Sequence, residues 1–369
     1  MRVERIELFH LRMPLVRPFV TSVARYLDRE MLLVRAESGG VSGWGEVPAP
    51  AAPLYSPETS QTAWHIIRDF LGPKMKDKEF SGPGPVSELF SFVRGHNMAK
   101  AGIEMAVLDL FARIQNKPVH QVLGGERKEL PTGVSLGIEE NVTALLARVE
   151  DAVSKGYQRI KLKIKPRWDV DIVAEVRRHF PKVPLMADAN SAYTLADIDH
   201  LQRLDEFDLM MIEQPLAYDD YVDHAKLQAR IRTPICLDES IRSYDDARRA
   251  FELGSCRIIN IKQARVGGPY AAKMIHNLAK ARHAPVWCGG LLETGIGRAH
   301  NIALATLPNF TLPGDIAASD RYYAEDVVDP PVTVTPQGTL RVPEGPGIGY
   351  NVVDRRIALY CVRKEYVLS

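Results

Sequence analysis

The chain has 369 residues, of which 46% are hydrophobic and 25% are charged, and its formal net charge at pH 7 is +1. This composition is typical of a globular protein, and the near-neutral charge excludes the basic surface with which proteins bind nucleic acid or an anionic membrane. The four cysteines show no paired spacing, and the sequence has neither a signal-peptide pattern at its start nor a hydrophobic run of membrane-spanning length, so we expect a cytoplasmic protein without disulfides or a zinc site.

The N-terminal part of the chain begins with alternating apolar and polar residues. Residues 2–13 predict an outer strand, and residues 30–47 predict a hairpin. Segments 17–23 and 47–55 show no such alternation, so we predict irregular loops there. We expect these two loops to set the specificity for the substrate side chain.

Helices are predicted next, over residues 56–71 and 86–93 and from Asn97 onward. The third helix carries one apolar stripe at helical spacing, formed by Ile103, Ala106, Val107, Leu110, Phe111 and Ile114. Asn97 is predicted to be its N-cap. Because the strands precede the helices without alternating with them, we predict an α+β capping domain over residues 1–125.

Five ionisable residues recur at intervals of 24 or 25 residues, each at or near the end of a short apolar run: Lys163, Asp188, Glu213, Asp238 and Lys262. Such runs are typical of buried parallel strands, and the helical spacing between them completes one β/α unit per interval. An open doubly wound sheet would spread the five positions along an edge, whereas a closed barrel points them toward one cavity. We therefore predict an α/β fold with a (β/α)₈ barrel over residues 126–324.

The remaining barrel strands are predicted at residues 132–137, 285–289 and 310–315. The first of them should point Ser135 into the barrel. After the barrel, segments 338–342 and 353–367 contain strand-like patches. We expect these patches to pack on the capping domain, which would then be completed by residues from about 325 to 369.

The three carboxylates Asp188, Glu213 and Asp238 lie at the ends of consecutive predicted strands. Carboxylate oxygens are the ligands that Mg²⁺ prefers, and an octahedral ion keeps further positions for water and a substrate carboxylate. The alternative is that these side chains are buried ion-pair partners of the neighbouring lysines. Three acidic residues in register favour a Mg²⁺ site, for which Mn²⁺ could substitute.

Lysines lie on both sides of the three carboxylates. Lys161 and Lys163 are two residues apart on one strand and therefore share a face, where each should lower the pKa of the other. Lys163 is then a candidate general base. Lys262 lies four strands further on, so the two lysines could remove a proton from either face of a carbon next to a carboxylate, while the metal would hold the resulting enediolate.

Three further residues follow these positions closely. Asn190 could orient the substrate or cap the next helix. Arg265 could tune the charge of Lys262 or form a surface ion pair. Glu239 should point away from Asp238 and support the metal ligands from behind. The glycine-rich run at 295–300 lacks the third glycine of a dinucleotide-binding loop, so it predicts the start of a helix instead.

The motifs resemble those of the enolase superfamily, muconate lactonizing enzyme subgroup, over nearly the full length of the chain. They are Lys-Leu-Lys at 161–163, Asp-Ala-Asn at 188–190, Glu-Gln-Pro at 213–215, Asp-Glu-Ser at 238–240 and Asn-Ile-Lys-Gln-Ala-Arg-Val-Gly-Gly at 260–268. Within the subgroup, residues 54–59, 161–166, 289–298 and 314–323 resemble the o-succinylbenzoate synthase and N-succinylamino acid racemase family. The use of a Lys or His base with Mg²⁺ is a known property of enolase-superfamily sites.

This resemblance implies a Mg²⁺-dependent dehydration in menaquinone synthesis. Lys163 would abstract the proton next to the carboxylate, and Lys262 would stabilise the intermediate or act on the opposite face in racemisation. The arginine at 265 goes with racemase ability in the family. Gly289 and Asp315 lie in matching motifs, and we expect them to contact the substrate or support the residues that do.

Several functions stay open at this point. The leading hypothesis is the synthase with added racemase activity, and the alternatives are a dedicated N-acylamino acid racemase, a muconate-type cycloisomerase or a non-catalytic binding protein. A non-catalytic relative should have lost a lysine or a ligand, and all five residues are present. We expect a homo-oligomer that acts on a small-molecule carboxylate.

Overall fold

The structure, a computed structural model, describes residues 1–22 and 24–369. Its central feature is a curled sheet of seven parallel strands that follow one another in chain order. The strands are β5 (Val134–Leu136), β6 (Ile160–Lys163), β7 (Leu185–Asp188), β8 (Ile212–Glu213), β9 (Ile235–Leu237), β10 (Ile258–Ile261) and β11 (Val286–Cys288). The alternation of strands and helices predicted from the apolar runs is confirmed.

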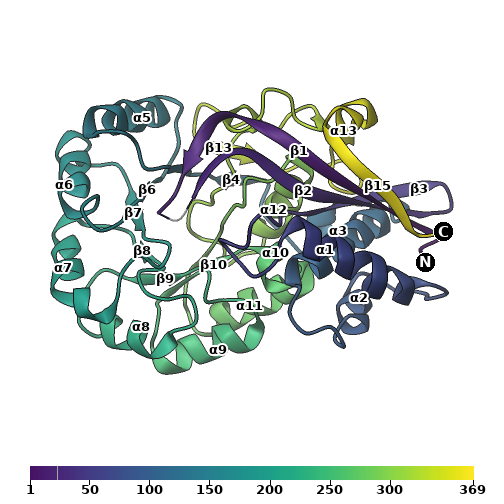
Figure 1. Ribbon diagram of the computed structural model, residues 1–369, viewed down its shortest axis with the longest axis horizontal. Helices are drawn as coiled ribbons and strands as arrows, with labels where there is room; N and C mark the ends of the chain where they lie inside the picture. Colours follow the sequence, from purple (N-terminus) through teal and green to yellow (C-terminus); the bar gives the residue numbers. More distant parts are fainter. Residues whose placement is uncertain (23) are drawn as a thin grey trace.

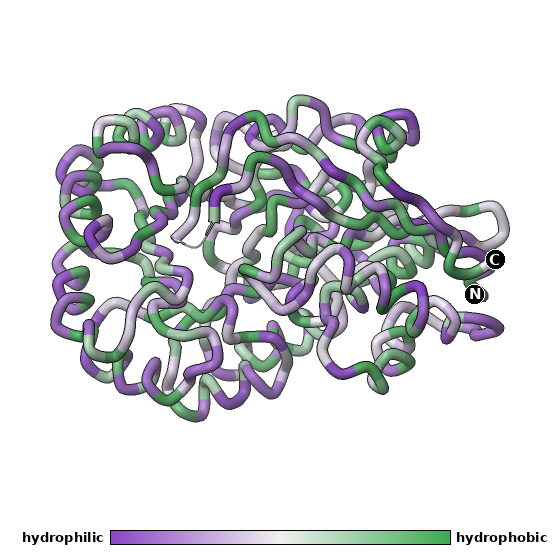
Figure 2. The backbone as a smooth tube through the Cα atoms, in the orientation of Figure 1, coloured by the Kyte–Doolittle hydropathy of each residue, from purple (hydrophilic) through white to green (hydrophobic). Residues whose placement is uncertain are grey.

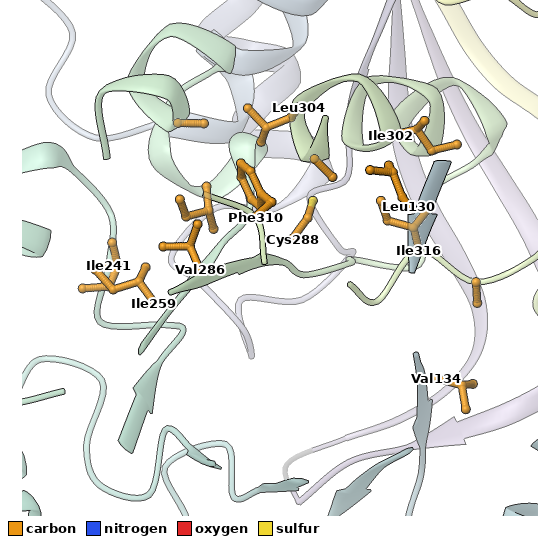
Figure 3. Packing of buried hydrophobic residues seen from close by; sticks show 14 of the residues in the cluster. Leu130, Val134, Ile241, Ile259, Val286, Cys288, Ile302, Leu304, Phe310 and Ile316 are labelled. Atoms are coloured by element: carbon orange, nitrogen blue, oxygen red, sulfur yellow. The ribbon is translucent and has the colours of Figure 1, made fainter. Parts of the chain in front are cut away.

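The gap between β11 and β5 is filled by residues 310–315, which we predicted as an eighth strand. Within the described residues this segment forms two isolated parallel bridges and no regular strand: Phe310 pairs with Val286, and Gly314 pairs with Thr132. Phe310 also packs beside Leu304 and Cys288 in the buried cluster of Figure 3. The segment still closes the barrel, because it bonds to both flanking strands.

Helices surround the sheet (Figure 1). They are α5 (Val142–Ser154), α6 (Val170–His179), α7 (Ile198–Gln202), α8 (Tyr221–Gln228), α9 (Tyr244–Leu253), α10 (Gln263–Val266), α11 (Pro269–Ala281) and α12 (Gly295–Ala305). Hydrophilic and hydrophobic residues alternate along the outer helices in Figure 2, as expected where one face covers the sheet. In the described part of the chain, none of the helices combines the length and apolarity that crossing a lipid bilayer requires.

The capping domain contains an antiparallel sheet in the order β15-β1-β2-β3. Its elements are β1 (Arg5–Val20), β2 (Arg25–Ser38), β3 (Val41–Val47), α1 (Ser60–Ile66), α2 (Gly84–Leu89), α3 (Asn97–Ile114) and β15 (Cys361–Leu368). Helix α1 continues as a π-helical turn over Ile67–Leu71. Strand β3 lies directly on α3, and a Cβ atom on Gly45 would come within 2.1 Å of a helix carbonyl oxygen, so only glycine fits there.

Segment 17–23 is not the irregular loop that we predicted. Strand β1 extends into it as far as Val20, and Phe19 pairs with Tyr26 of β2, which begins at Arg25; Val23 lies outside the described residues. The hairpin crosses to the barrel (Figure 1), where Ser22 donates a hydrogen bond to the backbone of Ala189 and Val20 accepts one from Ile138. The tip therefore covers the C-terminal ends of the first barrel strands.

The prediction that Asn97 caps α3 is wrong. His96 occupies the cap position with a left-handed backbone, and its side chain makes no capping bond. The carboxylate of Glu58 instead accepts the free N–H groups of Met98 and Ala99, which a side chain distant in sequence can do as well as a local cap. The Asn97 amide is used between domains, where it donates to the backbone carbonyls of residues 242 and 265.

The C-terminal segment divides between the two domains. Its last strand, β15, pairs antiparallel with β1, as we expected for the tail. Strand β13 (Thr339–Arg341) pairs instead with β4 (Glu129–Pro131), just before the first barrel strand, so the expectation that segment 338–342 packs on the capping sheet is wrong. The remaining elements are α4 (Val119–Leu123), β12 (Val328–Asp329), β14 (Asn351–Val352) and α13 (Asp354–Tyr360). The domain limits at 125 and 325 stay predictions.

A buried carboxyl group lies where α3 packs against the barrel. Glu104 accepts one hydrogen bond, from the backbone of Tyr270 at 2.7 Å, and its other oxygen has no partner among the described residues. Burial raises the pKa of Glu104 from 4.5 to about 8. The group is therefore protonated in the folded protein at neutral pH.

We expect Glu104→Gln to flatten the pH dependence of stability. Between pH 4.5 and about 8 the folded protein holds a proton that the unfolded chain releases, so this group stabilises the fold fully below pH 4.5 and loses that contribution as pH rises toward 8. The slope is at most about 1.4 kcal/mol per pH unit. Urea unfolding should show that the free energy of unfolding falls less from pH 5 to pH 8 in Glu104→Gln than in the wild type. The substitution of an exposed residue, Glu206→Gln, should leave this pH dependence unchanged. Equal pH slopes for Glu104→Gln and the wild type would contradict the assignment.

Candidate active site

The strand register brings the predicted site residues together. Lys163 pairs with Asp188, and Asp188 pairs with Glu213, across adjacent parallel strands. Asp238 directly follows β9 and Lys262 directly follows β10, and all five side chains are buried. Both Lys163 and Lys262 line one cavity of about 300 Å³, which they enter from strands separated by three others.

Lys161 is the most heavily paired cation of the site. Its Nζ atom lies 2.7 Å from Asp315, 2.9 Å from Glu213 and 3.2 Å from Asp188. It also lies 4.9 Å from the centre of the Trp287 ring. Burial would lower the pKa of Lys161, but the three carboxylates raise it above the ordinary lysine value. The prediction of a lowered pKa on this lysine is therefore wrong for the site as it stands.

Lys163 faces a different set of partners. Its amine donates to Asp188 at 2.6 Å and to the side-chain oxygen of Asn190 at 2.7 Å. The Asn190 amide in turn donates to Glu239 at 2.9 Å. Asn190 thus orients the lysine and does not cap a helix, and Glu239 lines the cavity beside it.

The pKa values of the carboxyl groups around Lys163 are shifted in opposite directions. Burial would raise the pKa of Asp188, but Lys163 and Lys161 lower it well below the usual range. The pKa of Glu213 is raised by burial and by the charge of Asp188. Burial and Asp188 likewise raise the pKa of Glu239. A cation placed among these oxygens would relieve their mutual repulsion.

Lys262 is held by groups from both domains. Its amine donates to Asp238 at 2.7 Å and to the Tyr55 hydroxyl at 3.1 Å. Burial would lower the pKa of Lys262, but Tyr55, Glu213 and Glu239 together raise it above the ordinary value. Lys262 is therefore protonated in this arrangement, as Lys161 is.

Arg265 is buried on α10 and forms no surface ion pair. Its guanidinium contacts the Asp238 carboxylate and donates to the backbone oxygen of Ile241 at 2.7 Å. It also donates to the Tyr55 hydroxyl at 3.2 Å. Of the two roles that the sequence left open, the structure supports the one beside Lys262, since both cations share Asp238.

Asp315 and Ser135 meet on the other side of the barrel. The Ser135 hydroxyl donates to Asp315 at 2.9 Å, and Arg159 forms an ion pair with the same carboxylate at 2.8 Å. Burial would raise the pKa of Asp315, but Arg159 and Lys161 lower it far below the usual range. Arg159 was not predicted, because nothing in its strand pattern distinguishes it from a surface residue that precedes a buried strand.

Gly289 leaves room for the lysine beside it. A Cβ atom at this position would come within 2.2 Å of the Asn260 side chain and 2.6 Å of the Lys262 side chain. Any larger residue would therefore push Lys262 from its place. Asn260 is itself fixed, since it donates to Glu213 at 2.6 Å.

The capping domain supplies the outer wall of the cavity. From the sequence we predicted only that two loops would contribute to this wall, and not which of their residues would do so. The residues that it contributes are Phe19, Thr21, Tyr26, Arg29, Pro48, Pro50, Leu54 and Tyr55. Tyr55 could have been found from its position in the family-like segment 54–59, but Arg29 lies inside an ordinary strand pattern and carries no such signal. Tyr322 and Leu292 complete the wall from the barrel side.

The oxygen donors suit a divalent metal ion, although in residues 1–22 and 24–369 no three acidic, histidine or cysteine side chains are arranged to hold one as they stand. Ammonium groups neutralise all three carboxylates in place of a metal ion, and they belong to Lys161, Lys163 and Lys262. One oxygen of Glu239 and the side-chain oxygen of Asn260 are buried without a partner among the described residues. Such orphaned oxygens next to three carboxylates fit a divalent cation held by Asp188, Glu213 and Asp238.

Comparison with known proteins identifies the family of this chain. The family described as "Mandelate racemase / muconate lactonizing enzyme, N-terminal domain" matches residues 5–124, and the family "Enolase C-terminal domain-like" matches residues 144–356. A protein named o-succinylbenzoate synthase from Geobacillus stearothermophilus is 57% identical, covering 97% of this chain and 96% of that protein. One named N-succinylamino acid racemase from Thermus thermophilus is 46% identical, covering 95% of each.

A solved structure gives the same answer for the fold. The crystal structure of an enolase superfamily member from Listeria innocua has a TM-score of 0.96 and 43% identity, covering 100% of this chain and 99% of that one. The resemblance drawn from the strand-end motifs is thus confirmed over both domains. The chain belongs to the enolase superfamily, in its muconate lactonizing enzyme subgroup.

Proposed function

We propose that this protein is a Mg²⁺-dependent o-succinylbenzoate synthase that dehydrates 2-succinyl-6-hydroxy-2,4-cyclohexadiene-1-carboxylate and also racemises N-succinylamino acids. The observation that carries the proposal is the pair of buried lysines, Lys163 and Lys262, that reach one cavity on either side of three carboxylates. The 57% identity to a named synthase supports the synthase reaction, and the 46% identity to a named racemase supports the second activity.

Lys163 acts as the general base in this proposal. Its neutral amine takes the proton from the carbon next to the substrate carboxylate, and the resulting ammonium returns a proton to the departing hydroxyl, which leaves as water. Asn190 holds the amine in position through its side-chain oxygen. When bound to Asp188, Glu213 and Asp238, Mg²⁺ would supply positive charge that stabilises the negative charge developing on the substrate carboxylate.

Lys262 approaches from the other side of the carboxylate cluster. In the dehydration its positive charge stabilises the intermediate, and in racemisation it delivers or removes a proton on the opposite face. Arg265 and Tyr55 fix its position through Asp238. A dedicated racemase is the second candidate, favoured by the burial of Arg265 against Asp238. Cytoplasmic location and assembly into a homo-oligomer stay predictions.

The purified protein with Mg²⁺ should convert the cyclohexadiene substrate to o-succinylbenzoate and should exchange the α-proton of N-succinylamino acids in deuterated water. Removal of the metal with EDTA should abolish both reactions, because nothing then stabilises the negative charge that develops on the substrate carboxylate, and Mg²⁺ should restore them. Ultraviolet absorbance follows the first reaction and proton NMR the second. Exchange without dehydration would favour the dedicated racemase, and neither reaction in the presence of Mg²⁺ would refute the proposal.

Lys163→Ala should lower kcat for dehydration by about 10²- to 10⁴-fold, the typical contribution of general-base catalysis. Steady-state assays with the cyclohexadiene substrate measure the loss. Lys165→Ala is the matched control, because this exposed lysine lies two residues further along the chain and does not line the cavity. Dehydration at wild-type rate in the Lys163 variant would exclude the lysine as the base.

Lys262→Ala should stop racemisation but leave α-proton exchange on one enantiomer. Lys163 can still remove the proton that faces it, whereas no amine remains on the opposite face to complete inversion. Proton NMR of separate L- and D-N-succinylamino acids in deuterated water distinguishes the two steps. Equal loss of exchange for both enantiomers, with the fold intact by circular dichroism, would contradict the assignment of one face to each lysine.

A further inference from the structure

Arg29 is a buried cation in the outer wall of the active-site cavity. Its side chain comes from β2 of the capping domain, is 5% exposed and lines the cavity. One terminal nitrogen, Nη2, donates to the backbone oxygens of Pro48 at 2.9 Å and Leu291 at 3.0 Å. The Nε atom is buried and has no partner among the described residues.

No carboxylate in the described part of the chain lies within ion-pair distance of Arg29. The other cavity residues of the capping domain are uncharged, and they are Phe19, Thr21, Tyr26, Pro48, Pro50, Leu54 and Tyr55. The lysines of the cavity differ in this respect, since each of them contacts an acidic side chain. A buried guanidinium without a counter-charge is costly, so the wall is built for an anion that the protein itself does not provide.

We propose that Arg29 binds the distal carboxylate of the substrate, the one at the end of the succinyl chain, and so determines the preference for succinyl over uncharged acyl groups. This proposal rests on the proposed function, in which the other carboxylate lies among the strand-end residues of the barrel. Arg29 comes from the opposite wall, on the capping domain. The planar guanidinium suits a carboxylate, because its N–H groups match the two oxygens.

Arg29 also joins two loops, because Pro48 follows β3 and Leu291 follows β11. A purely structural role in holding these loops would reduce turnover of every substrate alike. A role in recognition would reduce turnover only of substrates that carry the distal charge. The two roles can therefore be separated by a pair of substrates that differ in that charge alone.

The test compares kcat/KM for an N-succinylamino acid and for the matching N-succinamoylamino acid, whose distal carboxylate is replaced by an amide. The wild type should prefer the succinyl substrate by about 100-fold, as expected for one charge-assisted pair in a buried site. In Arg29→Met this preference should fall to within a few-fold, mainly through KM, with little change for the succinamoyl substrate. Arg29→Lys should keep part of the preference, since lysine keeps the positive charge but cannot donate two parallel hydrogen bonds to the carboxylate. Arg25→Met, an exposed arginine on the same strand, is the control for a general effect of charge.

Binding measurements test the role of Arg29 independently of whether the protein catalyses the proposed reactions. Titration calorimetry with o-succinylbenzoate and with its distal methyl ester needs no turnover. Arg29→Met should weaken the dicarboxylate by about 100-fold and the ester by a few-fold at most. Equal losses for both ligands, or an unchanged preference for the charged one in the folded variant, would overturn the role of Arg29 while leaving the synthase activity intact.

Discussion

The contact of one buried ammonium group with three carboxylates is the constraint on which this active site depends. Lys161 reaches Asp188, Glu213 and Asp315 from three different segments of the barrel. Charges removed from water are stable only when they are paired with good geometry, so these segments must end at the same level. The parallel register from β6 to β8 provides this alignment, and closure of the barrel by residues 310–315 delivers the third carboxylate. The barrel must therefore close before the charges are balanced.

The capping domain is part of the same electrostatic arrangement. The Tyr55 hydroxyl donates to Asp238, and Lys262 and Arg265 both donate to that hydroxyl. One uncharged group from a loop thus links two cations and a carboxylate of the barrel. Movement of the loop that carries Tyr55 would disturb Lys262 directly, because the two side chains are hydrogen-bonded. The position of the capping domain and the position of the Lys262 amine are coupled for this reason.

The sequence predicted the local parts of this arrangement and missed many of the distant contacts. The strand ends at Lys163, Asp188, Glu213, Asp238 and Lys262 follow from apolar runs and one repeated interval, both of which are local signals. The bond between Ser135 and Asp315 joins residues 180 apart, and that between Tyr55 and Lys262 joins residues 207 apart, so no pattern within a window of sequence contains them. The same reason explains the error at α3, where Glu58 replaces the cap that local rules assign to Asn97. We did not predict Arg29, because the sequence pattern around it is that of an ordinary amphipathic strand.

Without a metal ion, the lysines of the site supply the positive charge that a divalent ion would otherwise bring to the three carboxylates. Lys161, Lys163 and Lys262 each form an ion pair with one of the three carboxylates. A divalent ion among the carboxylates would take over that neutralisation, and its positive charge would also disfavour the protonated form of a nearby lysine. In the proposed mechanism, such an ion would replace Lys163 as the partner of Asp188 and leave the lysine to serve as the base. Metal binding and release of the lysine would then be linked, which requires the carboxylates and lysines to share one buried space, as they do here.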